Sequence, residues 1–148
     1  MSLQNHLASD LPLITGDRVQ LEQVILNLLI NALEAMSSVA EGPRELSVSS
    51  QKVKKIREER RFAHTTLEDA EVTYVLVTVR DSGPGLDPKN VSRLFDAFYT
   101  TKPHGLGMGL AISRSIIEAH GGWLSATAGS SGGAVFEFTL PILAESNS

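Results

Sequence analysis

Two asparagines, four residues apart, form the first of three candidate sets of side chains whose types and spacing could serve chemistry. Asn27 and Asn31 fall in an apolar periodic stretch and would project from one side of a helix, at the margin of its apolar stripe. An amide oxygen suits a hard cation such as Mg²⁺, which keeps most of its waters in proteins. Amides at a helix margin also commonly bond only to nearby backbone, so this pair alone leaves both interpretations open.

A second candidate is Asp81-Ser82-Gly83-Pro84-Gly85-Leu86, which directly follows a predicted strand. Its two glycines allow a sharp turn and a close approach of a ligand to bare backbone. The Asp81 carboxylate, at the strand end, can accept a hydrogen bond from an exocyclic amine. An ordinary Asx turn containing Pro-Gly has the same composition.

A third candidate, Gly105-Leu106-Gly107-Met108-Gly109-Leu110, opens a predicted helix. Successive N–H groups and the positive end of the helix dipole would together suit an anion. The segment fits neither the Rossmann nor the Walker glycine pattern. Lys102 lies just upstream with Thr100 and Thr101, where an ammonium group could reach phosphate oxygens. A flexible glycine loop beside a surface lysine would have the same sequence.

The elements that must position these residues follow from periodicity and turn signals. Helical spacing predicts helices over 20–36, with Asp17 as N-cap, and over 109–119, ended by Gly121-Gly122. Alternation predicts strands over 44–53, 72–80, 123–128 and 134–140, and a short helix is expected over 88–95. Hairpin-linked strands with interspersed helices indicate an α+β fold: a two-layer α/β sandwich whose mixed, mostly antiparallel sheet carries helices on one face.

Length and composition set further bounds. A chain of 148 residues fits one domain, and we assign residues 1–10 to a lead-in (a linker or a cloning remnant), 11–142 to the domain and 143–148 to a tail. The net charge of -4 argues against nucleic acid or an anionic membrane as partner, and the basic run over 52–61 is interpreted as a solvated loop. The chain has no cysteine, which excludes disulfide and thiolate chemistry. It contains neither an apolar run of the ~18 residues that span a bilayer nor a signal-peptide pattern.

Taken in order, the motifs are far more specific than any one of them. The chain reads Asn-x-x-x-Asn, Asp-x-Gly-x-Gly, Leu-Phe-Asp-Ala-Phe-Tyr-Thr-Thr-Lys and Gly-x-Gly-x-Gly-Leu. This order resembles the N, G1, F and G2 boxes of the histidine-kinase ATPase family, in the superfamily shared with DNA gyrase, MutL and a heat-shock chaperone. The resemblance runs from Leu11 to Pro141, and two strings, 27–32 and 107–113, look most similar to nitrogen-regulation-type kinases with a short lid over ATP.

The resemblance implies a Bergerat-type ATP-binding fold and a role for each matching residue. Asn31 would ligate Mg²⁺ beside Asn27, Asp81 would bind the adenine amino group, and Phe95 and Phe98 would anchor the lid. Asn27, Asn31 and Lys102 are the predicted catalytic residues. The residues that we predict to contact nucleotide are Asn27, Asn31, Glu34, Asp81, Gly83, Gly85, Leu86, Phe98, Thr100, Thr101, Lys102, His104, Gly105, Leu106, Gly107, Met108, Gly109 and Leu110.

One position favours a kinase over an ATPase. Members of the superfamily that hydrolyse ATP usually carry Glu four residues before the Mg-binding Asn, where it acts as a general base. This chain has Asn27 there, and an amide does not take a proton at neutral pH. Glu22 and Glu34 flank the position as alternative bases. Gyrase-like hydrolysis and a nucleotide-sensing module without catalysis remain the competing functions.

None of the four histidines has the context of a phosphoacceptor, which an acidic residue usually follows: His6, His64, His104 and His120 all lack one. We therefore expect the acceptor histidine in a separate helical dimerisation domain of a parent kinase, with a response regulator as the indirect partner. By itself the domain is expected to be monomeric and cytoplasmic, whether or not the parent protein is anchored in a membrane.

Overall fold

The structure is a computed structural model that describes residues 2–7, 16–37, 42, 44–56, 71–87, 89, 91–96, 109–129 and 132–142. Its helices and strands, in chain order, are β1 (Ser2–Leu7), α1 (Arg18–Ser37), β2 (Glu45–Ile56), β3 (Glu71–Asp81), the 3₁₀ turn η3 (Val91–Arg93), α2 (Gly109–Ala119), β4 (Trp123–Ala128) and β5 (Ala134–Pro141). The strands form one sheet in the order β1-β2-β3-β5-β4.

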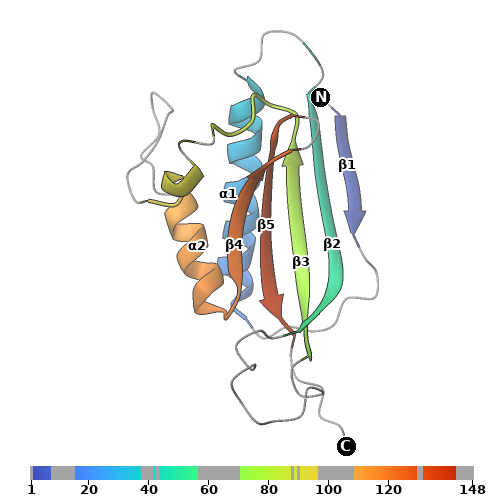
Figure 1. Cartoon of the computed structure of the whole chain (residues 1–148), viewed down its shortest axis with the longest axis vertical. Helices are drawn as coiled ribbons and strands as arrows, with labels where there is room; N and C mark the ends of the chain where they lie inside the picture. Colours follow the sequence, from blue (N-terminus) through green and yellow to red (C-terminus); the bar gives the residue numbers. More distant parts are fainter. Residues whose placement is uncertain are drawn as a thin grey trace, which may run out of the picture.

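The sheet is mixed, and both helices cover one of its faces (Figure 1). β1 runs parallel to β2, whereas β2–β3, β3–β5 and β5–β4 are antiparallel pairs. Alternate residues of β3 and β5 point into the core, among them Val79, Phe136 and Phe138. The predicted two-layer α/β sandwich is therefore confirmed.

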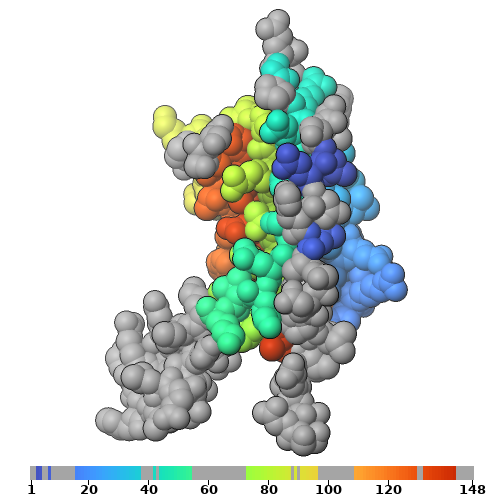
Figure 2. All heavy atoms as spheres, turned by 90° about the vertical axis from the view of Figure 1, so that its right-hand side faces the viewer, coloured from blue at the N-terminus to red at the C-terminus, as the bar shows by residue number. Residues whose placement is uncertain are grey.

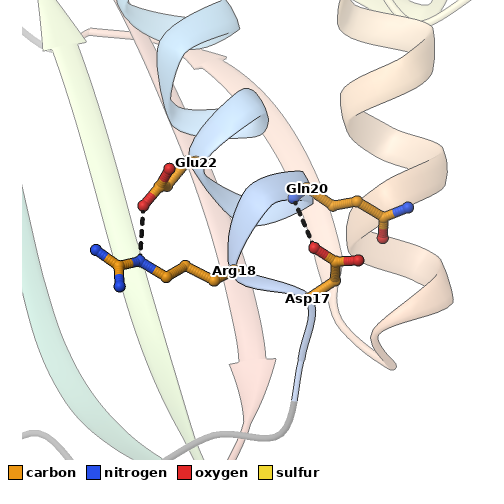
Figure 3. A network of polar contacts seen from close by, with 4 residues as sticks. All are labelled: Asp17, Arg18, Gln20 and Glu22. Atoms are coloured by element: carbon orange, nitrogen blue, oxygen red, sulfur yellow. Dashed lines mark hydrogen bonds and ion pairs between the residues drawn. The ribbon is translucent and has the colours of Figure 1, made fainter.

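Helix α1 buries one side through a four-residue repeat. Val24, Leu28, Ala32 and Met36 are at most 1% exposed, and the helix packs against β3. At its first turn the Asp17 carboxylate accepts a hydrogen bond from the Gln20 N–H at 3.1 Å, as predicted for the N-cap (Figure 3).

Helix α2 ends in a Schellman motif that both terminal glycines make possible. The Gly122 N–H donates to the Ile117 carbonyl and the Gly121 N–H to the Glu118 carbonyl, each at 2.9 Å, while Gly121 has φ 83°. A side chain on Gly122 would collide with the Thr139 carbonyl oxygen. The motif turns the chain directly into β4, which keeps α2 packed over β4 and β5.

Three details differ from the sequence prediction. Strand β1 lies within residues 1–10, for which the sequence predicts a lead-in and no strand. It forms the edge of the sheet beside β2, and this edge faces the viewer in Figure 2. The expected short helix over 88–95 is reduced to η3, because the chain continues through turns to Asp96. β2 and β3 each extend further into their connection than expected, and they pair along Leu46–Ile56 and Glu71–Asp81.

Candidate nucleotide site

Asp81 ends β3 as a buried carboxylate. The residue is 3% exposed, and its Oδ1 accepts hydrogen bonds from the N–H groups of Gly83 at 2.9 Å and Ala134 at 3.3 Å. Burial raises the pKa of Asp81, while the hydrogen bonds from Gly83 and Ala134 oppose that rise. Among the described residues, both of these bonds end on Oδ1 and not on Oδ2.

The loop after Asp81 is confined between α1 and the start of β5. A Cβ on Gly83 would lie 3.3 Å from the carbonyl group of Ala35 in α1, and one on Gly85 would lie 3.1 Å from the Gly133 carbonyl oxygen. Gly85 has φ 88°, a conformation that side chains disfavour. Close backbone approach therefore disfavours a side chain at both glycines of the predicted segment, and the positive φ of Gly85 disfavours one further. The approach at Gly83 brings the loop after Asp81 alongside the C-terminal half of α1.

Asn27 links α1 to the first turn of α2. Its Nδ2 donates to the Ser113 hydroxyl at 3.1 Å and lies 3.4 Å from the Gly109 carbonyl oxygen. A carbonyl oxygen can only accept, so the amide must present its NH₂ group to α2. Its Oδ1 is then directed away from α2.

The other polar residues predicted on α1 lie near the same side. Asn31, one turn after Asn27, is half-buried, and Glu34 is exposed, three residues further on. Glu22 lies elsewhere: its carboxylate pairs with Arg18 at 2.9 Å, and the two side chains are 62% and 90% exposed (Figure 3). This solvated ion pair near the N-terminus of α1 does not place Glu22 as a base at Asn27.

The predicted lid anchor Phe95 packs against the core and also against α2. The Arg114 guanidinium lies 4.8 Å from the Phe95 ring centroid and 4.5 Å from that of Trp123, and it pairs with Glu118 at 3.1 Å. The chain that leads toward the predicted lid is thus held to α2 by a stacked cation.

His120 is engaged at both ring nitrogens. Nε2 accepts a hydrogen bond from the Asp17 N–H at 2.9 Å, and Nδ1 lies 2.7 Å from the Ile116 carbonyl oxygen, which requires Nδ1 to be the protonated nitrogen. Neither nitrogen has a lone pair to spare for a phosphoryl group, which agrees with the prediction that His120 is not a phosphoacceptor. Of the other histidines, His64 and His104 lie outside the described residues, and so does the side chain of His6.

Half of the predicted site residues belong to the described part of the chain, and half lie outside it. Asn27, Asn31 and Glu34 on α1, Asp81 to Leu86 after β3, and Gly109 and Leu110 at the start of α2 are all described. Those outside the described residues are Phe98, Thr100, Thr101, Lys102, His104, Gly105, Leu106, Gly107 and Met108. Sequence reasoning missed the contributions of Ser113 and Ala134. Ser113 follows Gly109 by one helical turn and could have been placed on its face, but its burial and partner could not have been inferred.

The donor set limits what kind of cation could bind. In the described part of the chain, no group of three or more His, Cys, Asp or Glu side chains could hold a metal ion. Amide oxygens on one helix fit an ion that takes one or two protein ligands and completes its shell with water and phosphate, which is how Mg²⁺ is usually bound. Within the same residues, no helix is long and apolar enough to cross a membrane.

Comparison with known proteins gives the family. The family model described as histidine kinase-, DNA gyrase B-, and HSP90-like ATPase matches residues 16–144. The chain is 40% identical over 139 residues to the sensor histidine kinase TmoS of Ectopseudomonas mendocina, covering 93% of this chain and 13% of TmoS. It is 43% identical over 129 residues to the sensor protein FixL of Bradyrhizobium diazoefficiens, covering 87% of this chain and 22% of FixL.

Among solved structures, the catalytic domain of histidine kinase ThkA superposes with a TM-score of 0.69 at 28% identity, covering 95% of this chain and 78% of that one. The chain thus spans less than a quarter of the two sensor proteins but most of an isolated catalytic domain. The chain belongs to the histidine kinase-, DNA gyrase B-, and HSP90-like ATPase family, and it is homologous to the catalytic, ATP-binding domains of sensor histidine kinases.

Proposed function

We propose that this domain binds Mg-ATP between α1, the Asp81 loop and the start of α2, and delivers the γ-phosphoryl group to a histidine on a separate helical domain. The observation that carries the proposal is the Asn27 amide, which in the described residues bonds to α2 through its NH₂ group and not through its oxygen. An amide at this position can bind and orient but cannot act as a base.

The adenine end would be read by Asp81. Its Oδ2 would accept a hydrogen bond from the exocyclic amino group, and the close backbone at Gly83 and Gly85 would let the flat base lie against the loop. The backbone N–H groups at the start of α2, beginning at Gly109, would face the phosphates with the positive end of the helix dipole. Lys102 is proposed to add a cation there.

Asn31, with Asn27 beside it, would hold Mg²⁺ through amide oxygens. The bound ion would neutralise charge on the phosphate oxygens. The chain's own residues would then contribute position rather than acid–base chemistry. An acceptor imidazole nitrogen attacks the γ-phosphorus with its lone pair, the bond to the bridging oxygen breaks, and that oxygen keeps the electron pair as ADP leaves. The phosphorylated ring then releases the proton of its other nitrogen to water. The neutral imidazole needs little activation, so in-line placement accounts for the catalysis.

The proposed partners follow because this domain would position ATP while the attacking histidine belongs to another domain. We propose that the acceptor histidine belongs to the helical dimerisation domain of a longer, multidomain sensor kinase, which passes the phosphoryl group to a response regulator. A cytoplasmic location of this domain is part of the same proposal. The small fraction of TmoS and FixL that the chain covers supports a multidomain parent.

The test is a phosphotransfer assay with ³²P-labelled ATP, this domain and the separately produced acceptor domain of the parent kinase. Label should appear on the acceptor, and Asn31→Ala should lower the rate by about 100-fold or more. Gln23→Ala, an exposed change on the same helix, should leave the rate unchanged. Steady hydrolysis without an acceptor would indicate a gyrase-like ATPase, and tight ATP binding without transfer would indicate a nucleotide sensor.

A further inference from the structure

The contact between Asn27 and Ser113 joins the two helices that carry the proposed Mg²⁺ and phosphate ligands. Asn27 lies in the middle of α1, whereas Ser113 lies one turn after Gly109, the first residue of α2. Ser113 is fully buried, at 0% exposed, among the apolar residues of the helix–sheet core. Burying a hydroxyl away from water costs folding free energy unless the hydroxyl is hydrogen-bonded, and the Ser113 hydroxyl is bonded to the Asn27 amide.

Two groups on α2 hold the Asn27 amide, but only one of them determines which end of the amide faces α2, because the Ser113 hydroxyl can either donate or accept. The Gly109 carbonyl oxygen can only accept, so it requires Nδ2 on the α2 side, but its distance of 3.4 Å makes that bond weak. The Ser113 bond, at 3.1 Å, is the shorter of the two. Without the hydroxyl, the contacts between the amide and the described part of α2 would reduce to the long one, which would hold the amide weakly. A rotated amide would present its NH₂ group where a cation needs oxygen.

We propose that Ser113 is a positioning residue: its buried hydroxyl anchors the Asn27 amide in the orientation that the Gly109 carbonyl oxygen sets, in which Oδ1 is presented to the Mg²⁺ of bound Mg-ATP. The inference rests on the proposed function, which it deepens. Ser113 and Gly109 both belong to α2, whose first turn is proposed to face the triphosphate. The orientation of the Asn27 amide, a proposed Mg²⁺ ligand on α1, therefore depends on α2. Ser113 touches neither substrate nor cation and acts through Asn27.

The proposal is tested by a double-mutant cycle on this domain, with AMPPNP, a non-hydrolysable ATP analogue, as the probe in MgCl₂ or in EDTA. Ser113→Ala should raise the Kd for Mg-AMPPNP about fivefold to tenfold, the effect of one lost hydrogen bond. In EDTA the Kd should change less than about twofold, because the nucleotide contacts are intact. In the Asn27→Ala background, Ser113→Ala should have almost no further effect.

Ser115→Ala provides the matched control, because Ser115 is an exposed serine on the same helix. It should leave both Kd values unchanged. If Ser113→Ala weakens binding equally with and without Mg²⁺, or equally in the Asn27→Ala background, Ser113 contributes only packing and the proposal is wrong. If the wild-type domain binds no Mg-AMPPNP at all, the proposed function fails, and this inference fails with it. If the wild-type domain binds Mg-AMPPNP and Ser113→Ala leaves that Kd unchanged, this inference alone is wrong.

A second measurement uses the free wild-type domain, so it does not depend on a ligand or on whether a variant folds. In ¹H–¹⁵N NMR spectra of the free wild-type domain, the Asn27 side-chain NH₂ protons should exchange slowly with water, whereas those of exposed Gln23 on the same helix should exchange fast. Equal, fast exchange of both side chains would overturn the proposal. Where Ser113→Ala folds, its Asn27 signal should shift and exchange faster while the Gln23 signal stays in place.

Discussion

At each of two positions along the α1–α2 pair, a polar side chain hydrogen-bonds across from one helix to the other or to its cap, but the two contacts use different parts of that side chain's hydrogen-bonding capacity. The helices are antiparallel, since Asp17 meets His120 at one end and Asn27 meets Gly109 and Ser113 further along. At the first, or closed, end both ring nitrogens of His120 are used within the protein. At the second, or open, end the contacts of Asn27 with described residues use its NH₂ group and not its oxygen.

This difference distinguishes a contact that only holds the two helices together from a contact that could also bind a ligand. The closed end can only fix the distance between the helices, and a Cβ on Gly16 would lie 2.7 Å from the His120 ring, so the contact is tight as well as saturated. The open end fixes the helices and retains acceptor capacity, and the Asp81 loop reaches the C-terminal half of α1 on this side through Gly83 and Ala35. Substitutions at the two ends should therefore affect different measurements.

The largest expected effect is on nucleotide affinity at the open end. Asp81→Asn should raise the Kd for ATP by about 100-fold, because a charged acceptor for the adenine amino group is lost and an NH₂ group can take its place. The free energy of unfolding at neutral pH should stay the same or increase, because the amide oxygen can still accept from Gly83 and Ala134 while the buried charge is gone. Calorimetric titration and urea unfolding measure the two quantities, and unchanged ATP affinity would remove Asp81 from the site.

At the closed end the expected effect is smaller and falls on stability. His120→Ala should lower the free energy of unfolding by about 1–2 kcal/mol, because the Asp17 N–H loses its acceptor. The Kd for Mg-ATP should change less than about twofold. His120→Gln, which keeps an acceptor near the position of Nε2, should recover part of the stability. If His120→Ala weakens Mg-ATP binding as much as Ser113→Ala does, the two ends are not separable.

The smallest effect is a pH slope that Asp81 imposes on stability. Burial raises its folded-state pKa above the ordinary value of 3.8, so the folded domain holds this proton more tightly than the unfolded chain. The contribution of Asp81 to stability is therefore fully present below that ordinary value and is lost as pH rises through the folded-state pKa. The unfolding free energy of the wild type minus that of Asp81→Asn should fall across this acidic window and then level off. A difference that rises with pH would contradict the raised pKa.

Much of the fold could be predicted because its signals are local. The four-residue apolar repeat of α1, the Asp17 cap and the Gly121-Gly122 ending of α2 depend only on neighbouring residues and backbone sterics. β1 was missed because a short strand of mixed composition carries little propensity, and its pairing with β2 across about 40 intervening residues decides its state. The 3₁₀ turn replaced a predicted helix for a similar reason, since too few residues there share a buried face.

The sequence by itself determined which residue types were available: an amide at position 27 in place of a carboxylate, an aspartate at a strand end, and glycines where backbone approaches closely. Only the tertiary structure decided which atoms of those residues remain for a ligand. Ser113 is 86 residues from Asn27, and Ala134 is 53 residues from Asp81, so neither partner leaves a trace in local pattern. Packing buries these polar groups and thereby forces them to pair, and in the described residues that pairing uses Nδ2 of Asn27 and Oδ1 of Asp81.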